Sequence, residues 1–341
     1  MKFQLHTQFP TDLEEKWNAL LAESIHHVPF LRYEYLRNWW NTRGGGEWDA
    51  SSRLALVTAT EKDQLVGIAP LFHNTCEDNP SLLFLGAVEI SDYLDFIVRP
   101  ADLSPFLEGL LRFLKYDPKI PVWRSLVLHN LLESSPTLAH FNSMSTDGNW
   151  RIESAVSDHA PRIALPGDWE TYLAGLDKKQ RHEIRRKMRR LEEAEKSSRW
   201  YFVKDEDNLE EAITDFLELM AYDPQKALFL KPEMKTTMWA TIRSAFKNGY
   251  LQLAFLEIDG EKAAGYLNFD YLNHLWIYNS GMNPKFLTAS PGWVLLGYLL
   301  RWANENQRES FDFMRGNEDY KYRFGANDRF VYRLTVQPAN S

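Results

Sequence analysis

A repeated order of helix and strand signals constrains the fold of this chain more than any other feature. A helical pattern at 33–40 leads into the run "LALVTAT", the polar turn "EKDQ" and a second run, "LVGIAPLF". Another helical pattern, at 234–246, leads into "LQLAFLEI", the turn "DGEK" and "AAGYLNF". Two strand-like runs around a polar turn predict a β-hairpin. The sequence therefore predicts one unit of helix and hairpin used twice.

The repeat continues with a strand, a helix and a strand in each half. The runs "LLFLGAV" and "LWIYNSG" are each followed by a helix that opens with Ser-Pro, at Ser104 and Ser290. Ser is a favoured N-cap and Pro a favoured first helical residue. The strand-like runs "RSLVLHN" and "SFDFMRG" come next. A crossover helix between two strands of one sheet makes them parallel. We expect an α/β (α+β) fold of two tandem domains, each a mixed twisted sheet flanked by helices.

Length and composition agree with two soluble domains. At 341 residues the chain exceeds the usual size of one hydrophobic core. The turn-rich stretch between the halves predicts an N-terminal domain over 1–160 and a C-terminal domain over 161–341. The net charge of −8 argues against specific nucleic-acid partners. The single cysteine, Cys76, and the absence of a long apolar run predict a cytoplasmic protein with no transmembrane segment.

The second Ser-Pro helix start is a candidate anion site. The first backbone N–H groups of a helix and its positive dipole end attract phosphate. Gly292 lacks a Cβ, so a phosphate can approach the backbone there, whereas Phe106 stands at the matching place in the first half. The same residues also suit a well-capped buried helix. Both interpretations stay open on the motif alone.

The stretch "FDFMRGNEDYKYRFG" is the second candidate. On a strand, the rings of Phe311 and Phe313 would point to one face and the carboxylate of Asp312 to the other. Gly316 then permits a sharp turn, and acidic, phenolic and cationic groups follow it. Such a mixture can supply a general base, a general acid and charge clamps. A loop fixed by salt bridges and aromatic packing explains it equally well.

The third candidate is the basic segment "LDKKQRHEIRRKMRRLEEAEK". Asp177 is a predicted N-cap, and Ile184, Met188 and Leu191 form a narrow apolar stripe. Most residues from 178 to 190 are Lys or Arg, and acidic residues follow them. That order opposes the helix dipole, which favours an anionic partner over a purely structural role. A solvated charged face remains the alternative.

Other catalytic signatures are missing from the sequence. It contains no GxxxxGK phosphate loop, no HExxH or paired CxxC metal motif and no GxSxG elbow. With one cysteine in a polar loop, a thiol nucleophile is not expected. We therefore expect no metal and a direct transfer without a covalent enzyme intermediate.

The order of these motifs resembles a known family. "IAPLF…LFLGAVEISDYLDFIV", "LDKKQRHEIRRKMRRLE" and "YNSG…SPGWVLLGYLLRWA…FDFMRGNEDYKYRFG" are similar to the CelD-like GNAT-type N-acyltransferases associated with cellulose and exopolysaccharide biosynthesis. These are relatives of the FemABX peptidyltransferases. The resemblance covers nearly the whole chain and implies two GNAT-like domains. Many relatives have Asp where this chain has Asn317, so that position is not expected to be a base.

The resemblance implies acyl transfer from an acyl-CoA, acetyl-CoA in the first place, to an amine of a small-molecule or saccharide acceptor. The donor would bind the strand end and helix start formed by Tyr278, Asn279, Ser280, Ser290, Gly292 and Trp293. The catalytic groups would be Asp312 or Glu318 as the base, Tyr320 and Lys321 at the leaving thiolate, and Arg315. The acceptor would contact Asp92, Tyr93 and Asp95, with Arg181, Arg185 and Arg189 facing the cleft between the domains.

Two other classes of function fit the same motifs. A FemX-like ligase would take its donor from aminoacyl-tRNA, which the basic segment supports. A non-catalytic GNAT-like module would assist polysaccharide assembly through a peripheral link to the synthesis machinery. The sequence does not identify the acceptor.

Overall fold

The computed structural model describes residues 1–48, 51–75, 79–144, 149–194 and 197–339, so Cys76 lies outside the described residues. The chain forms two compact units, Met1–Asp158 with Phe330–Ser341 and His159–Arg329. The predicted boundary after residue 160 assigns 330–341 to the second domain. In the structure Phe330–Pro338 forms a strand of the first unit.

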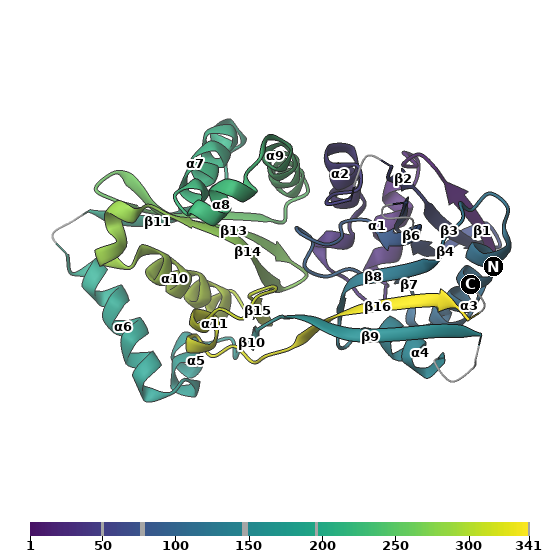
Figure 1. Cartoon of the computed structure of the whole chain (residues 1–341). Helices are drawn as coiled ribbons and strands as arrows, with labels where there is room; N and C mark the ends of the chain where they lie inside the picture. The colour runs from purple at the N-terminus through teal and green to yellow at the C-terminus, as the bar shows by residue number, and fades with distance from the viewer. Residues whose placement is uncertain (49–50, 76–78, 145–148, 195–196, 340–341) are drawn as a thin grey trace. The chain divides into compact units, whose positions relative to one another are not determined.

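The second unit is built on one six-stranded sheet (Figure 1). Its strand order is β10-β15-β14-β13-β12-β11. The strands are β10 (Arg162–Ala164), β11 (Ser198–Phe202), β12 (Leu251–Ile258), β13 (Glu261–Tyr271), β14 (His274–Met282) and β15 (Ser310–Asp312). The helices are α5 (Trp169–Gly175), α6 (Lys178–Glu192), α7 (Leu209–Ala221), α8 (Pro224–Phe229), α9 (Pro232–Lys247), α10 (Pro291–Glu305) and α11 (Asp319–Arg323), and η4 (Glu206–Asn208) and η5 (Pro284–Ala289) are short 3₁₀ turns.

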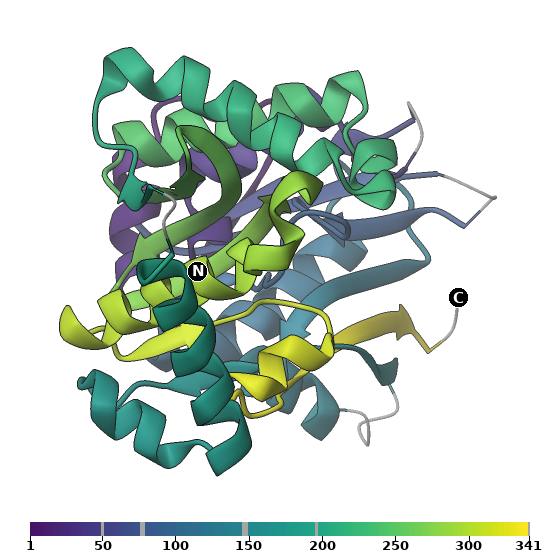
Figure 2. The same cartoon turned by 90° about the vertical axis from the view of Figure 1, so that its left-hand side faces the viewer.

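Helices cover both faces of this sheet. Figures 1 and 2 show α7 and α9 on one face and α10 with α6 on the other. Gly281 of β14 lets α7 approach closely, because a Cβ there would lie 2.4 Å from the backbone carbonyl carbon of Leu219. On the opposite face, Leu295 and Leu299 of α10 are fully buried in the main core. Predicted stripe residues Ile184, Met188 and Leu191 bury α6 in the same core.

The predicted parallel pair of the second half is confirmed. β14 and β15 pair in parallel from His274↔Ser310 to Trp276↔Asp312, and α10 lies between them in the chain. The predicted hairpin also forms, because β12 and β13 pair antiparallel around the turn at Asp259 and Gly260. Both turn residues have positive φ, which Gly and Asp tolerate better than most residues.

The first unit divides its strands between two sheets. One sheet has the order β1-β3-β4-β7, and the other β2-β5-β6-β8-β16-β9. The strands are β1 (Lys2–His6), β2 (Arg53–Leu54), β3 (Leu56–Glu61), β4 (Gln64–Ala69), β5 (Leu71–Asn74), β6 (Ser81–Phe84), β7 (Ile97–Val98), β8 (Ser125–Leu132), β9 (Trp150–His159) and β16 (Phe330–Pro338). The helices are α1 (Glu14–Ala22), α2 (Tyr33–Arg43), α3 (Leu103–Tyr116) and α4 (Pro136–Met144), with 3₁₀ turns η1 (Pro29–Leu31) and η3 (Pro100–Asp102).

Pro70 separates the two sheets of the first unit. It lies between β4, which pairs with β3 and β7, and β5, which pairs with β2 and β6. Proline has no N–H for a sheet ladder, so the strand "LVGIAPLF" cannot continue unbroken in one sheet. The crossover is nevertheless the predicted one, because β6 and β8 pair in parallel and α3 joins them.

The two Ser-Pro helix starts differ in detail from the prediction. Helix α3 begins at Leu103 with Asp102 as N-cap, so Ser104 is not the cap. Ser290 does occupy the N-cap position of α10, with Pro291 as the first helical residue, but its side chain makes no capping hydrogen bond. Its backbone is left-handed, with φ of 54°. In α3, Phe106 is fully buried against Gly67 of β4, so its ring fills the matching place in the first unit.

Candidate functional site

An open sheet edge lies beside a helix start in the second unit. β15 ends at Asp312, opposite Trp276, whereas β14 continues to Met282. Within the described residues no strand takes the place of β15 along the rest of β14. Such an edge can pair with the amides of an extended ligand. The sequence analysis placed a candidate site at the end of β14. The two strands separate there because β15 has three residues and β14 has nine.

A β-bulge interrupts β14 at the point where the edge opens. Leu267 lies opposite Asn279 and Asn268 opposite Ile277, so Tyr278 is the extra residue of the bulge. The Tyr278 ring packs 5.2 Å from that of Phe269. A bulge bends a strand and re-aims its backbone groups. Tyr278 therefore lies outside the regular ladder between β13 and β14.

The start of α10 closes on the end of β14 through small and flexible side chains. A Cβ on Gly292 would lie 2.2 Å from the sulfur of Met282, so the space beside this glycine holds the Met282 side chain. That side chain belongs to a residue that is 43% exposed. The hydroxyl of Tyr266 donates to the Gly292 carbonyl at 3.3 Å and ties β13 to the same helix start. The absence of a Cβ at Gly292 therefore makes room for the Met282 side chain, whether or not a ligand also binds there.

Trp293 lies in a cluster of aromatic and cationic groups. Its ring packs 4.5 Å from that of Phe324, and the ammonium of Lys187 lies 4.2 Å above it. The indole Nε1 is shielded from solvent and has no hydrogen-bond partner in the described part of the chain. Lys187 also approaches the carboxylate of Glu183 at 3.4 Å. The basic helix α6 therefore reaches the start of α10 through Lys187, which was not among the predicted site residues.

Lys226 of α8 adds a cation that the sequence analysis did not single out. Its ammonium donates to Asn279 Oδ1 at 3.0 Å and also to the backbone carbonyl of Ser280. Asn279 Oδ1 accepts the backbone N–H of Ser280 as well, at 2.8 Å. Burial lowers the pKa of Lys226, against the opposing effect of the Asp223 and Glu318 carboxylates. A lone Lys in the segment "DPQKALF" gave no sequence signal of this contact.

Two buried phenol groups lie in the same unit, on β13 and α11. Burial raises the pKa of the Tyr320 hydroxyl, and the nearby charge of Glu318 raises it further. Burial also raises the pKa of the Tyr266 hydroxyl. The Tyr320 ring packs edge-on against Phe313, with 6.0 Å between the ring centroids. Both phenols therefore stay protonated at neutral pH, and that of Tyr266 already donates to the Gly292 carbonyl. Tyr266 is a second residue that sequence reasoning missed, because it lies inside an ordinary strand pattern.

The turn before α11 brings Glu318 and Lys321 together. Gly316 has a φ of 106°, which confirms the predicted turn, and a Cβ there would meet a Glu318 carboxylate oxygen at 2.5 Å. Lys321 is 2% exposed. Its ammonium donates to the carbonyls of Arg315 at 2.7 Å and Gly316 at 3.0 Å, and lies 2.9 Å from the Glu318 carboxylate. These three partners match its three N–H bonds, so Lys321 fixes the turn.

Asp312 is buried with both of its carboxylate oxygens bonded inside the fold. One accepts the backbone N–H of Met314 at 2.9 Å, and the other accepts from the Arg329 guanidinium at 2.7 Å. Asp312 is only 1% exposed. The Glu318 side chain is 57% exposed. Of the two predicted bases, Glu318 is the one that a ligand can reach.

The predicted arginine stripe of α6 is largely exposed. Arg185 forms an ion pair with Glu170 of α5, and Arg189 lies 3.8 Å from Glu193. Arg181 donates to the Ala174 carbonyl at 3.4 Å. The expected contact of this stripe with an anionic ligand stays a prediction.

The residues predicted for the acceptor lie in the loop between β6 and β7 of the first unit. Tyr93 and Asp95 are fully buried. Asp95 accepts hydrogen bonds at 2.6 Å from the hydroxyls of Ser135 and Thr137 at the start of α4. Asp92 is half-buried. Direct contact of an acceptor with Tyr93 or Asp95 would require this loop to open.

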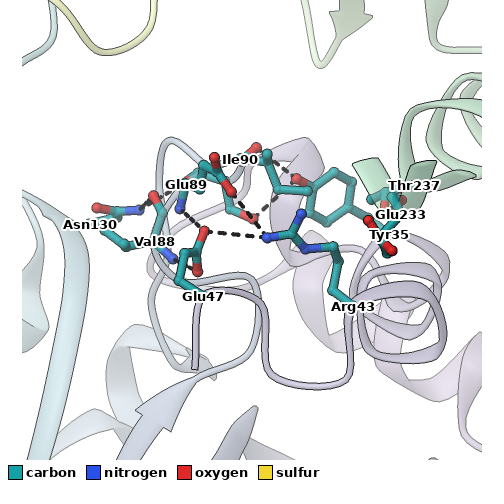
Figure 3. A network of polar contacts seen from close by, with 10 residues as sticks. Tyr35, Arg43, Glu47, Val88, Glu89, Ile90, Asn130, Glu233 and Thr237 are labelled. Carbon is teal, nitrogen blue, oxygen red and sulfur yellow. Dashed lines mark hydrogen bonds and ion pairs between the residues drawn. The ribbon is translucent and has the colours of Figure 1, made fainter. Parts of the chain in front are cut away.

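A polar network holds the preceding part of the same loop (Figure 3). The Glu47 carboxylate accepts the backbone N–H groups of Val88 at 3.2 Å and Glu89 at 3.0 Å. The Arg43 guanidinium of α2 lies 3.0 Å from the Glu89 carboxylate and 3.8 Å from that of Glu47. Asn130 of β8 donates to the Val88 carbonyl at 3.1 Å. Burial raises the pKa of Glu47 to about 7.

The described residues contain neither a metal-binding cluster nor a membrane-spanning helix. No group of three or more His, Cys, Asp or Glu side chains converges there in a way that could hold a metal ion. Among the helices of the described ranges, none combines the length and the apolar character needed to cross a bilayer.

Part of the second unit is similar to a known protein family. Residues 178–322 match the family model described as "Acetyltransferase (GNAT) domain". This range includes the open edge of β14, the start of α10 and the turn before α11. None of the curated proteins matches the chain. The CelD-like relationship stays a prediction.

The fold is similar to that of several solved structures over nearly the whole chain. FemX aligns with a TM-score of 0.67 and 10% identity, covering 98% of this chain and 97% of FemX. A conserved protein of unknown function from Bacteroides thetaiotaomicron VPI-5482 aligns with a TM-score of 0.61 and 10% identity, covering 98% and 100%. L-PGS from Bacillus licheniformis aligns with a TM-score of 0.54 and 12% identity, covering 96% and 92%.

These structural similarities show the fold, and they confirm the predicted fold class of mixed sheets flanked by helices. The family model adds the type of chemistry, because GNAT domains in general use acyl-CoA. Residues 178–322 therefore match a GNAT acetyltransferase domain, and the match indicates an N-acyltransferase.

Proposed function

We propose that this protein transfers an acyl group, acetyl in the first place, from acyl-CoA to an amine of a small or sugar-linked acceptor. The observation that carries the proposal is the open edge of β14 beside the start of α10, inside the region that matches the GNAT domain. The edge offers hydrogen-bonding groups for the pantetheine amides, and the helix start offers N–H groups for the pyrophosphate. Asn279, Ser280, Ser290 and Gly292 lie at these two places.

In this proposal the acceptor amine attacks the thioester carbonyl carbon directly. A C–N bond forms, the C–S bond breaks, and the amine proton passes to Glu318 directly or through water. Tyr320 gives its proton to the departing thiolate, since its raised pKa keeps it protonated at neutral pH. A backbone N–H near Tyr278 would stabilise the developing oxyanion, a contribution of about 3 kcal/mol for such donors. Lys321 supports this arrangement by fixing the turn that carries Glu318.

Calorimetry with acetyl-CoA and CoA tests the donor. We expect saturable binding of both to the full chain. No measurable binding of either at millimolar concentration would contradict the proposal and favour the non-catalytic module. Untargeted mass spectrometry of metabolites that gain an acyl group would then identify the acceptor. The predicted cytoplasmic location and the link to polysaccharide synthesis belong to the same proposal.

A FemX-like ligase that uses aminoacyl-tRNA is the second candidate. The exposed basic side chains of α6 favour it, because exposed Arg and Lys residues can bind a phosphate backbone. Against it, Arg185 and Arg189 already lie beside Glu170 and Glu193. The net charge of −8 also opposes binding to a polyanion.

A further inference from the structure

Lys226 contacts the open edge of β14 from a separate element. It lies on α8, a short helix whose N-cap Asp223 accepts the backbone N–H groups of Gln225 and Lys226. This cap fixes the start of α8 and thus the point from which the Lys226 side chain extends. The side chain is half-buried, and its ammonium contacts Asn279 and Ser280.

The contact lies where β15 no longer accompanies β14. The backbone carbonyl of Ser280 accepts from Lys226, and the backbone N–H of Ser280 donates to Asn279 Oδ1 at 2.8 Å. Since Asn279 Oδ1 also accepts from Lys226 at 3.0 Å, one ammonium orients both groups. Side chains thus hold the backbone of the open edge in the absence of a neighbouring strand. The charge of the Glu318 carboxylate opposes the lowering of the Lys226 pKa that burial causes.

We propose that Lys226 is a positioning residue of the acyl-donor site. It fixes the Asn279 side chain and the Ser280 backbone at the open edge, beside the groups of β14 that a donor's amide chain would meet. This inference rests on the proposed function. It concerns a residue that acts through β14 and not one that touches the reacting atoms.

The test compares three variants by calorimetry with CoA and acetyl-CoA. Lys226→Met removes the ammonium and keeps a long side chain, Lys226→Arg keeps a charged donor, and Lys235→Met alters an exposed lysine of α9. We expect Lys226→Met to raise the Kd of both ligands about tenfold or more, the size expected for losing a charged hydrogen bond that fixes a binding surface. Lys226→Arg should recover most of this loss, and Lys235→Met should bind as the wild type does.

Thermal unfolding of the same variants separates positioning from general stability. Equal Kd values for the wild type and Lys226→Met would overturn the inference and leave the proposed function intact. A weaker Kd that tracks a lowered Tm, without recovery in Lys226→Arg, would also overturn it, because Lys226 would then be only structural. If the wild type binds neither CoA nor acetyl-CoA, the proposed function fails and this inference fails with it.

Discussion

Glu318 and Lys321 form one ion pair but have different surroundings. The Glu318 side chain is 57% exposed, while that of Lys321 is 3% exposed. An exposed carboxylate can exchange protons with a ligand, whereas a buried ammonium with three partners cannot leave them without cost. We therefore expect catalysis to depend on the first residue and stability on the second.

The variant Glu318→Gln should lower kcat by about 100-fold, the range for losing a positioned general base. Its Kd for acetyl-CoA and its Tm should stay close to those of the wild type, because the amide can still accept from Lys321. Steady-state kinetics with the acceptor found by mass spectrometry measures this. Turnover within about twofold of the wild type would show that Glu318 is not the base.

The variant Lys321→Met should instead destabilise the second unit. It leaves the carbonyls of Arg315 and Gly316 without their donor in a buried turn. An unsatisfied buried polar group costs about 1–3 kcal/mol, so a clear loss of Tm is expected. Lys285→Met, which alters an exposed ion pair with Glu261, is the control and should change Tm little. Equal Tm values for both variants would contradict the structural role of Lys321.

Glu47 makes the stability of the first unit depend on pH. Burial raises its pKa to about 7 from the usual 4.5, so between these pH values the folded state holds a proton that the unfolded state has released. Stability from this group should therefore fall as pH rises from about 4.5 to 7. Chemical unfolding at pH 5 and pH 8 measures the change. Glu47→Gln should reduce the difference between the two pH values, and an unchanged difference would contradict the assignment.

Gly281 and Gly292 of the second unit face different neighbours: the backbone of a helix in one case and a flexible side chain in the other. At Gly281 an added Cβ would lie 2.4 Å from backbone atoms of α7, which cannot move aside without shifting the helix. At Gly292 the nearest atom is the sulfur of Met282, the end of a flexible and partly exposed side chain. The first glycine is required for the packing of a helix on a sheet. The second can be replaced at lower cost.

The pair Gly281→Ala and Gly292→Val tests this difference between elements. Gly281→Ala should lose about 1–3 kcal/mol of stability by overpacking between β14 and α7. Gly292→Val should keep a Tm near that of the wild type and weaken acetyl-CoA binding about tenfold or more, because its side chain occupies the helix start. Thermal unfolding and calorimetry measure the two effects. Unchanged acetyl-CoA binding by Gly292→Val would place the donor elsewhere.

The elements were predictable where one local signal determined them. The two crossovers follow from apolar runs separated by Ser-Pro helices, and both parallel pairs formed as predicted. The break at Pro70 follows from proline chemistry, yet the strand run around it is apolar and reads as continuous. Lys226 and Tyr266 could not be found from the sequence. Their roles depend on contacts with Ser280 and Gly292, which are distant in the chain, and no local pattern encodes such contacts.

At the scale of the whole molecule, the last strand returns the chain to the first unit. β16 pairs antiparallel with β8 of the first unit, from Val331↔Leu132 to Val336↔Leu126. The sequence repeat is nearly symmetric, so it gave no reason to separate residues 330–341 from the second half. Pairing with β8 buries Val331, Leu334 and Val336 on the first unit. Burial of these side chains explains why the C-terminal segment belongs there.

The choice between acyl-CoA and aminoacyl-tRNA as the donor also depends on properties of the whole molecule. A FemX-like fold is compatible with either donor, because similarity near 10% identity shows the fold alone. The basic helix α6 has 15 residues, and the next element in the described part of the chain is the strand β11 and not a second basic helix. The acidic net charge further weakens attraction to a polyanion. We therefore expect tRNA to bind weakly.

Titration of tRNA at several ionic strengths measures this expectation. The wild type and an Arg181→Ala, Arg185→Ala, Arg189→Ala triple variant should both bind weakly at physiological salt, and non-specific contacts of a few phosphates should give a shallow slope of log K against log salt. In a parallel titration, the wild type should bind acetyl-CoA more tightly than it binds tRNA. Sub-micromolar tRNA affinity with a steep slope, lost in the triple variant, would overturn acyl-CoA as the donor. It would assign α6 to the tRNA backbone and make the protein a ligase, since only a multi-phosphate contact produces a steep salt dependence that three arginines can remove.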